Sequence, residues 1–220
     1  MTLNRPIDVL LKVSCALWLL SFASLQAGEP DSPMTTSVCE SCHGTNGVSK
    51  NPLVPILAGQ PYTLIEDNLL AFRAKRRICA PQRSDESPSA LLAKTMCTTV
   101  ASLEDTEITA LAAFFERQAF IPAEQAFEST LTASGSILHI EKGCERCHSQ
   151  GGRQTNAMAP ILAGQWMPYL RRAMDALRSG TRKGPKVMNT SIHNLNENEV
   201  EALLQYYASQ QEGMPGASNP

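Results

Sequence analysis

The chain has 220 residues, of which 43% are hydrophobic and 5% aromatic, and its formal net charge is −2. This length provides for one large domain or two small ones. A charge so close to neutral argues against nucleic acid as a partner. Outside the N-terminal segment, no stretch of the sequence is long and apolar enough to span a membrane.

The first 27 residues follow the pattern of a secretory signal peptide. Arg5 and Lys12 bracket a basic segment, an apolar run covers 13–25, and a small-residue cleavage site ends at Ala27. We expect export to the periplasm with cleavage near Ala27, which leaves no membrane span in the mature chain. An uncleaved membrane tether is the alternative.

A five-residue motif, C-x-x-C-H, occurs at 39–43 and again 105 positions later at 144–148. This motif is typical of covalent c-type haem attachment. Positions i, i+3 and i+4 share one face of a helical turn, so two thiols can reach the haem vinyl groups while the histidine binds the iron. For a single C-x-x-C, a zinc half-site or a thiol–disulfide pair is the alternative. Two copies, each with its histidine, predict two covalently bound c-type haems, attached through Cys39, Cys42, Cys144 and Cys147, with His43 and His148 as iron ligands.

The sequence around the two motifs is duplicated. The hexapeptide Pro-Ile-Leu-Ala-Gly-Gln at 55–60 recurs at 160–165 with the same offset of 105. Farther along, the offset becomes 92, so Met96 aligns with Met188 and the first copy carries 13 extra residues within 77–90. Six identical residues at one distance from each motif indicate an internal duplication.

Helical periodicity fills both copies, and no alternating strand pattern of useful length appears. We therefore predict an all-α fold. Apolar residues share one helix face at 64–72 and at 170–177. The last helix of each copy has the same apolar register, Ile108, Leu111, Ala112 and Phe115 against Val200, Leu203, Leu204 and Tyr207.

Helix and domain boundaries follow from these patterns. Ser102 and Asn194 are expected to be equivalent helix N-caps, and a short helix is expected at 134–143. The predicted organisation is a signal peptide at 1–27, a first domain at 28–121, a connector at 122–133, a second domain at 134–213 and a flexible tail at 214–220.

An electron-transfer haem needs a second axial ligand, and methionine sulfur in that position stabilises ferrous iron. Met96 is the only methionine between His43 and the second copy, and Met188 is the only methionine in register with it. We therefore predict Met96 and Met188 as the distal ligands. The remaining methionines of the second copy are expected to be core, packing or exposed residues: Met174, Met158 and Met167.

Each proximal histidine should donate its other ring nitrogen to a fixed acceptor. Pro55 and Pro160 each lie 12 residues after their histidine. We expect the carbonyl groups of these prolines to be the acceptors and to help form the haem site. The alternative is that each proline only shapes a loop.

Two cysteines remain after the motifs and Cys15 of the signal segment are set aside. Cys79 and Cys97 are 18 residues apart, and Cys97 is next to Met96. We expect a disulfide between them that holds the ligand loop. The alternative is that Cys97 replaces Met96 as a thiolate ligand.

Other polar residues are expected to have structural roles. His139 and His193 have no partner at motif spacing, and we expect packing or surface positions for both. Two basic clusters are expected to be solvated helix faces, with haem propionates or an acidic redox partner as alternative contacts. These clusters consist of Arg73, Lys75, Arg76 and Arg77, and of Arg171, Arg172, Arg178, Arg182 and Lys183.

On these residues, the chain resembles the two-domain class I cytochromes c, which include cytochrome c4-type proteins and the diheme cytochrome subunit of flavocytochrome c sulfide dehydrogenase. The most specific segments are 144–148, 161–170 and 206–211, and the connector 122–127 looks like that of the flavocytochrome subunit. The resemblance implies two tandem class I cytochrome c domains with histidine–methionine ligation. The family ligands fall on His43, Met96, His148 and Met188.

The resemblance also implies a redox protein partner. As the electron-accepting subunit of a flavin-dependent sulfide dehydrogenase, the chain would receive electrons from a separate FAD-containing chain, since its own sequence has no FAD-binding fingerprint. The alternatives are a free shuttle to a terminal oxidase or reductase, and a diheme enzyme such as a thiosulfate dehydrogenase.

Overall fold

The computed structural model describes residues 35–79, 95–154 and 159–211. The expected signal peptide, the tail and nearly all of the 13-residue insertion lie outside the described residues. The described part of the chain is helical and contains no β-strand, which confirms the all-α prediction. None of its helices is long and apolar enough to cross a membrane.

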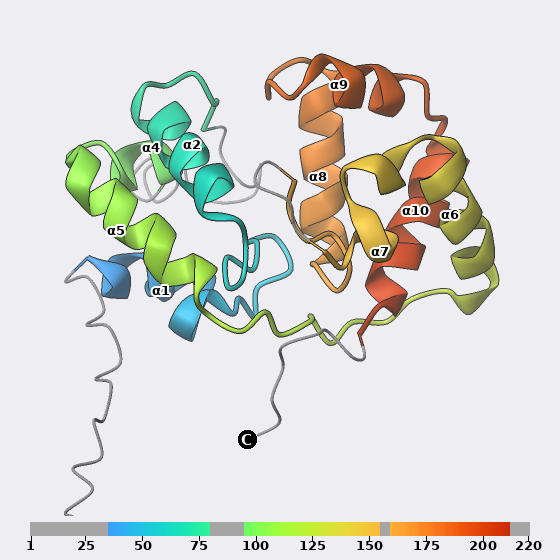
Figure 1. Ribbon diagram of the computed structural model, residues 1–220, viewed down its shortest axis with the longest axis horizontal. Coiled ribbons are helices and arrows are strands. Elements are labelled where there is room, and N and C mark those ends of the chain that lie inside the picture. Colours follow the sequence, from blue (N-terminus) through green and yellow to red (C-terminus); the bar gives the residue numbers. More distant parts are fainter. Residues whose placement is uncertain (1–34, 80–94, 155–158, 212–220) are drawn as a thin grey trace, which may run out of the picture. The chain divides into compact units, whose positions relative to one another are not determined.

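The first repeat contains one principal helix pair and shorter elements around it (Figure 1). Its core is formed by α2 and α5, which pack against each other. Ile65 and Leu69 of α2 meet Ile108, Leu111 and Phe115 of α5. The elements of this repeat are α1 (Thr36–His43), η1 (Thr45–Gly47), α2 (Tyr62–Arg73), α4 (Met96–Thr99) and α5 (Asp105–Glu116).

The second repeat is organised around its last helix. α10 packs closely against α6, and a Cβ atom at Gly135 would collide with the carbonyl oxygen of Ala202. Only glycine allows the two backbones to approach so closely. The elements of this repeat are α6 (Ser129–Glu141), η2 (Cys144–Arg146), α7 (Ser149–Gly152), α8 (Met167–Arg178), α9 (Lys186–His193) and α10 (Glu197–Ser209).

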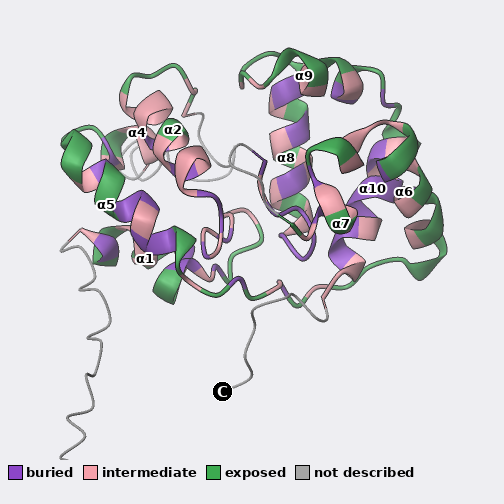
Figure 2. Ribbon diagram, in the orientation of Figure 1, coloured by how far each residue is buried: buried purple, intermediate pink, exposed green. Residues whose placement is uncertain are grey.

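Buried residues follow the predicted register. Figure 2 shows the buried faces of α5, α8 and α10. All eight apolar positions that were matched between the last helices are buried, at 2% exposure or less. Met174 is buried in the second core, as expected. Helical periodicity therefore predicted the core-facing side of these helices correctly.

Three helix starts differ from prediction. α5 begins after Glu104 and α10 after Asn196, so the predicted caps at Ser102 and Asn194 were two residues early. In each case the capping residue forms a reciprocal capping box with a glutamate three residues later. α6 begins at Ser129, five residues before the predicted start at 134. Packing against α10 offsets the weak helix propensity of the Ser- and Thr-rich first turns of α6.

The duplication is also visible in equivalent backbone hydrogen bonds. Leu57 N donates to Gly47 O at 2.8 Å, and Leu162 N donates to Gly152 O at 2.9 Å. A third apolar cluster combines the duplicated hexapeptides with the connector: Ile56, Ala58, Phe120, Ala123, Ile161 and Ala163. The hexapeptides therefore lie side by side and link the two repeats.

Candidate functional site

The first C-x-x-C-H motif lies on α1, whose last residue is His43. The His43 side chain is buried, and its Nδ1 atom lies 2.9 Å from the carbonyl oxygen of Pro55. Because a carbonyl can only accept, Nδ1 carries the hydrogen and the lone pair is on Nε2. Burial lowers the pKa of His43, and the hydrogen bond to Pro55 only partly opposes this shift. The imidazole is therefore neutral and has a nitrogen able to bind a metal.

The second motif reaches the same arrangement through a different backbone. Its first three residues form a 3₁₀ turn, η2, that follows Gly143 in the left-handed region (φ 76°). His148 is buried, and its Nδ1 lies 3.0 Å from the carbonyl oxygen of Pro160. Burial lowers the pKa of His148 as well. The expected histidine–proline contact is present in both repeats.

The four motif thiols divide into two similar pairs, and none of the four forms a disulfide. Cys39 and Cys144 are partly buried, whereas Cys42 and Cys147 are exposed. Burial raises the pKa of the Cys39 thiol to about 11 and also raises that of Cys144. Thioether formation adds a sulfur and a hydrogen across each haem vinyl group, so each motif supplies the two thiols that haem c requires.

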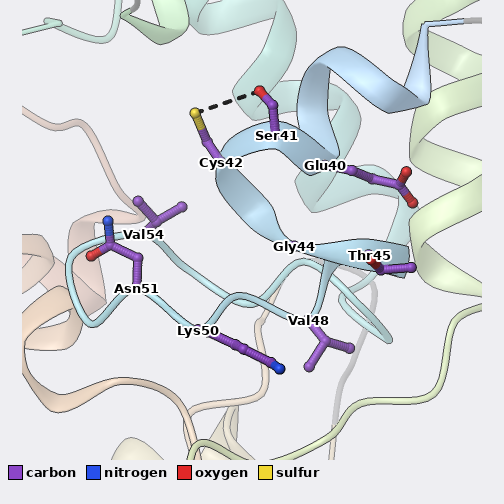
Figure 3. A pocket seen from close by; sticks show the side chains of 9 residues that line it. All are labelled: Glu40, Ser41, Cys42, Gly44, Thr45, Val48, Lys50, Asn51 and Val54. Carbon is purple, nitrogen blue, oxygen red and sulfur yellow. Dashed lines mark hydrogen bonds between the residues drawn. The ribbon is translucent and has the colours of Figure 1, made fainter.

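A cavity of about 730 Å³ adjoins the first motif (Figure 3). It lies between the C-terminal end of α1 and the loop that leads to Pro55, and the exposed thiol of Cys42 is in its wall. No hydrogen bond to Nε2 of His43 or His148 occurs within the described residues. The motif thiols and the free Nε2 atoms fit covalently attached haems, whereas neither His43 nor Met96 lines this cavity. The cavity is lined by Glu40, Ser41, Cys42, Gly44, Thr45, Val48, Lys50, Asn51 and Val54.

The predicted distal ligands occupy equivalent places. Met96 is the first residue of α4 and packs against the first core. Met188 lies in α9 and packs against the second core. Of the competing methionines, Met167 packs partly against the second core, and Met158 lies outside the described residues. The assignment of Met96 and Met188 to the irons remains a prediction.

Cys79 and Cys97 form a disulfide with an S–S distance of 2.01 Å and a Cα–Cα distance of 5.9 Å. The disulfide prediction is therefore confirmed. Since both sulfur atoms are bonded to each other, Cys97 is not a thiolate ligand in this state. The bond connects the segment after α2 to α4, directly beside Met96.

His139 has a more specific position than sequence analysis indicated. It is 1% exposed, and its Nδ1 lies 2.9 Å from the Tyr207 hydroxyl oxygen. Its Nε2 lies 2.8 Å from a carboxylate oxygen of Glu145 and 3.0 Å from the carbonyl oxygen of His148. Both of these can only accept, so Nε2 carries a hydrogen. His139 thus connects α6 and α10 to the second motif.

The sequence carries only an indirect sign of the hydrogen bonds around His139. Position 207 is a tyrosine where the first repeat has Phe115, so only the second repeat has a hydroxyl there.

His193, by contrast, is exposed as expected. Several residues of the basic clusters form ion pairs on helix surfaces, among them Arg73 with Asp105, Arg178 with Glu197 and Arg171 with Glu201.

Comparison with known proteins agrees with this geometry. No protein-family model matches the chain. A cytochrome c4 of Thiocapsa roseopersicina is 27% identical over 84% of this chain and 94% of the relative. A thiosulfate dehydrogenase electron acceptor of Thiomonas intermedia is 27% identical over 89% of this chain and 87% of the relative. The solved structure of Acidithiobacillus ferrooxidans cytochrome c4 superposes with a TM-score of 0.64 at 24% identity, over 79% of this chain and 99% of that one.

Proposed function

As a two-domain diheme c-type cytochrome of the class I fold, this chain transfers electrons, and we propose that it accepts them from a periplasmic dehydrogenase that oxidises an inorganic sulfur compound. The observation that carries electron transfer is the presence of two equivalent histidine sites, one in each of the linked repeats. Each bound haem iron supplies a one-electron ferric–ferrous couple.

The residues of the chain bind and orient the two haems. Cys39 and Cys42 hold the first, and Cys144 and Cys147 hold the second. His43 and His148 bind the irons, and the carbonyl groups of Pro55 and Pro160 orient the two imidazoles. Met96 and Met188 would complete the ligation, which would exclude water and other small ligands from the metal and favour electron transfer over direct catalysis.

The identity of the donor is supported by two observations. The relative from Thiomonas intermedia accepts electrons from a thiosulfate dehydrogenase, as its name states. The sequence itself resembles the cytochrome subunit of a sulfide-oxidising flavoprotein, in part through the connector 122–127. Both observations lead to the same donor class, and they differ in whether the donor carries a flavin.

Affinity purification of the tagged chain from the native periplasm tests this proposal, with absorbance read for haem and flavin together. We expect a second chain to co-elute and the complex to be reduced by thiosulfate or by sulfide. Flavin in the complex and reduction by sulfide would identify the flavoprotein arrangement. Haem alone in the second chain and reduction by thiosulfate would identify a thiosulfate dehydrogenase. A haem protein with no partner and no reduction by either compound would show that the chain is a free shuttle and would overturn the proposal.

A further inference from the structure

The carbonyl group that accepts from each proximal histidine belongs to a peptide whose N–H group is also hydrogen-bonded. In the first repeat this peptide joins Pro55 to Ile56. Its oxygen lies 2.9 Å from Nδ1 of His43, and its nitrogen donates to Oε1 of Gln165 at 2.9 Å. Because the peptide group is a planar, conjugated unit, its N–H and C=O ends are electronically connected. A single peptide therefore lies between His43 and a glutamine of the second repeat.

The second repeat contains the same arrangement in the opposite direction. The oxygen of the peptide between Pro160 and Ile161 lies 3.0 Å from Nδ1 of His148. The nitrogen of this peptide donates to Oε1 of Gln60, in the first repeat, at 3.0 Å. Each duplicated hexapeptide thus begins with the proline that accepts from its own histidine and ends with a glutamine that accepts from the other hexapeptide.

Both arrangements are shielded from water. Gln60 is 4% exposed and Gln165 is 2% exposed, and Ile56 and Ile161 belong to the third apolar cluster. Each glutamine also donates from Nε2 to the carbonyl oxygen of the same isoleucine, so two bonds fix the position of its side-chain oxygen. In surroundings that exclude water, hydrogen bonds in a chain polarise and strengthen one another.

The two arrangements differ in one respect. Oε1 of Gln165 also accepts from Trp166 N at 3.1 Å, whereas Gln60 is followed by Pro61, which has no N–H group. An amide oxygen has two lone pairs, so Gln165 can accept both bonds. Each glutamine therefore has a lone pair for the Pro–Ile peptide of the opposite repeat.

These bonds have a consequence for the proximal histidines. A hydrogen bond from the peptide N–H group increases the negative charge on the carbonyl oxygen of the same peptide. The carbonyl group then accepts more strongly from the histidine Nδ1–H, which makes Nε2 a stronger base toward iron. A more basic imidazole stabilises ferric iron relative to ferrous iron, and hydrogen bonding around an axial ligand is one means by which a protein sets a haem potential.

We propose that Gln60 and Gln165 are positioning residues for the proximal histidine of the opposite repeat, so that each repeat helps to set the reduction potential of the other repeat's haem. Gln165 acts on His43 and Gln60 acts on His148, in each case through the intervening Pro–Ile peptide. Both potentials thereby depend on the contact between the repeats. This inference depends on the two haems and not on the identity of the electron donor.

NMR of the diheme protein during a redox titration tests this proposal. The Nδ1–H signals of His43 and His148 are assigned in the reduced, diamagnetic protein, and each histidine follows the oxidation of its own iron. In Gln165→Leu we expect the His43 Nδ1–H signal to move upfield and the first haem's midpoint potential to rise, because the bond to Pro55 weakens. The signal of His148 and the second haem's potential should change little. Gln60→Leu should give the reverse distribution.

Gln205→Leu is the matched control. Gln205 is also buried and accepts from a distant backbone group, Glu128 N at 2.7 Å, but the carbonyl group of that peptide contacts neither proximal histidine within the described residues. This variant should lose stability without a change in either histidine signal or either potential. A purely structural defect would disturb the haem of the variant's own repeat at least as much as the opposite haem. Equal shifts at both haems, or no shift at either, would therefore overturn the proposal.

A measurement on the wild type decides the matter even if a leucine variant fails to incorporate two haems. Scalar couplings transmitted through hydrogen bonds should be detected between Ile56 N and the side-chain carbonyl carbon of Gln165, and between Ile161 N and that of Gln60. Their detection in the reduced protein supports the proposal. Their absence, in spectra that show the same couplings within α5 and α10, would mean that the glutamines do not accept these bonds in solution and that the proposal is wrong.

Discussion

Gln60 and Gln165 make the same pair of hydrogen bonds, each to the backbone of the opposite repeat. Gln165 accepts from Ile56 N at 2.9 Å and donates to Ile56 O at 3.1 Å. Gln60 accepts from Ile161 N at 3.0 Å and donates to Ile161 O at 3.4 Å. Both glutamines are buried, so these four bonds are shielded from water and connect the repeats reciprocally.

Gln165→Ala should weaken the connection between the repeats. It leaves the buried N–H and C=O groups of Ile56 without their partner, and we expect the free energy of unfolding to fall by about 2 to 4 kcal/mol. Denaturant titration of the diheme protein measures this loss. Gln118→Ala is the control, because among the described residues the side chain of Gln118 bonds only to the carbonyl group of Phe114, four residues away. Equal losses in the two variants would contradict a linking role for Gln165.

His139→Phe should destabilise the second repeat. Its removal takes one hydrogen bond from the buried hydroxyl group of Tyr207 and one from the carbonyl group of His148, which keeps its bond from Gly152 N, at an expected cost of about 1 to 3 kcal/mol. Urea unfolding of the holoprotein provides the measurement. His193→Phe, at an exposed position, should change stability little. If both variants unfold at the wild-type midpoint, the His139 cluster does not stabilise the fold.

Glu145 should make stability depend on pH. Burial raises the pKa of its carboxyl group, but the backbone N–H groups of Gly151 and Gln150 and the side chain of His139 lower it by more, to below the ordinary value of 4.5. A carboxylate with a lowered folded-state pKa stabilises the fold above pH 4.5, and this contribution disappears as the pH falls through the folded-state value.

Glu145→Gln should therefore be less stable than wild type at pH 7, by about 1 kcal/mol after allowance for solvent screening. The difference should shrink as the pH falls below 4.5. Unfolding titrations across this range provide the measurement. Glu40→Gln, at the equivalent position of the first motif, is the control, since the Glu40 carboxylate accepts a bond only from Asn46 N within the described residues. A pH-independent difference between Glu145→Gln and wild type would rule out this explanation.

Met188→Ala should open the second haem to added ligands. The reduced wild-type protein should not bind carbon monoxide, because both irons would have two protein ligands. The variant should bind it at one haem per chain, as measured by the change in the absorbance of the reduced protein. Met96→Ala should do the same at the first haem. Met174→Leu, in the second core, is the control. Equal binding by wild type and Met188→Ala would show that this ligand assignment is wrong.

The disulfide between Cys79 and Cys97 should protect both thiols from alkylation until a reductant is added. Replacing both cysteines by alanine should lower the free energy of unfolding by about 3 kcal/mol, because the bond closes a loop between residues 18 apart. Mass spectrometry after alkylation and denaturant titration measure the two effects. Rapid labelling of the unreduced native protein would be inconsistent with this bond in solution.

Much of the chemistry could be predicted from the sequence, because it depends on residues that are close together in the chain. The C-x-x-C-H motifs, the offset between the repeats and the apolar faces of the last helices are all local patterns. The contacts of His43 with Pro55 and of His148 with Pro160 span only 12 residues, and spacing was enough to suggest them.

Some contacts were decided by the tertiary structure alone. Gln165 meets Ile56 from 109 residues away, and His139 meets Tyr207 from 68 residues away. Arg77 and Arg182 each appear in the sequence as one more member of a basic cluster. Both guanidinium groups interact with the hydroxyl group of Tyr169. No periodic pattern identifies this contact, because it depends on how the two repeats pack. Local spacing thus determined which groups each repeat carries, and packing between distant segments determined which of those groups meet.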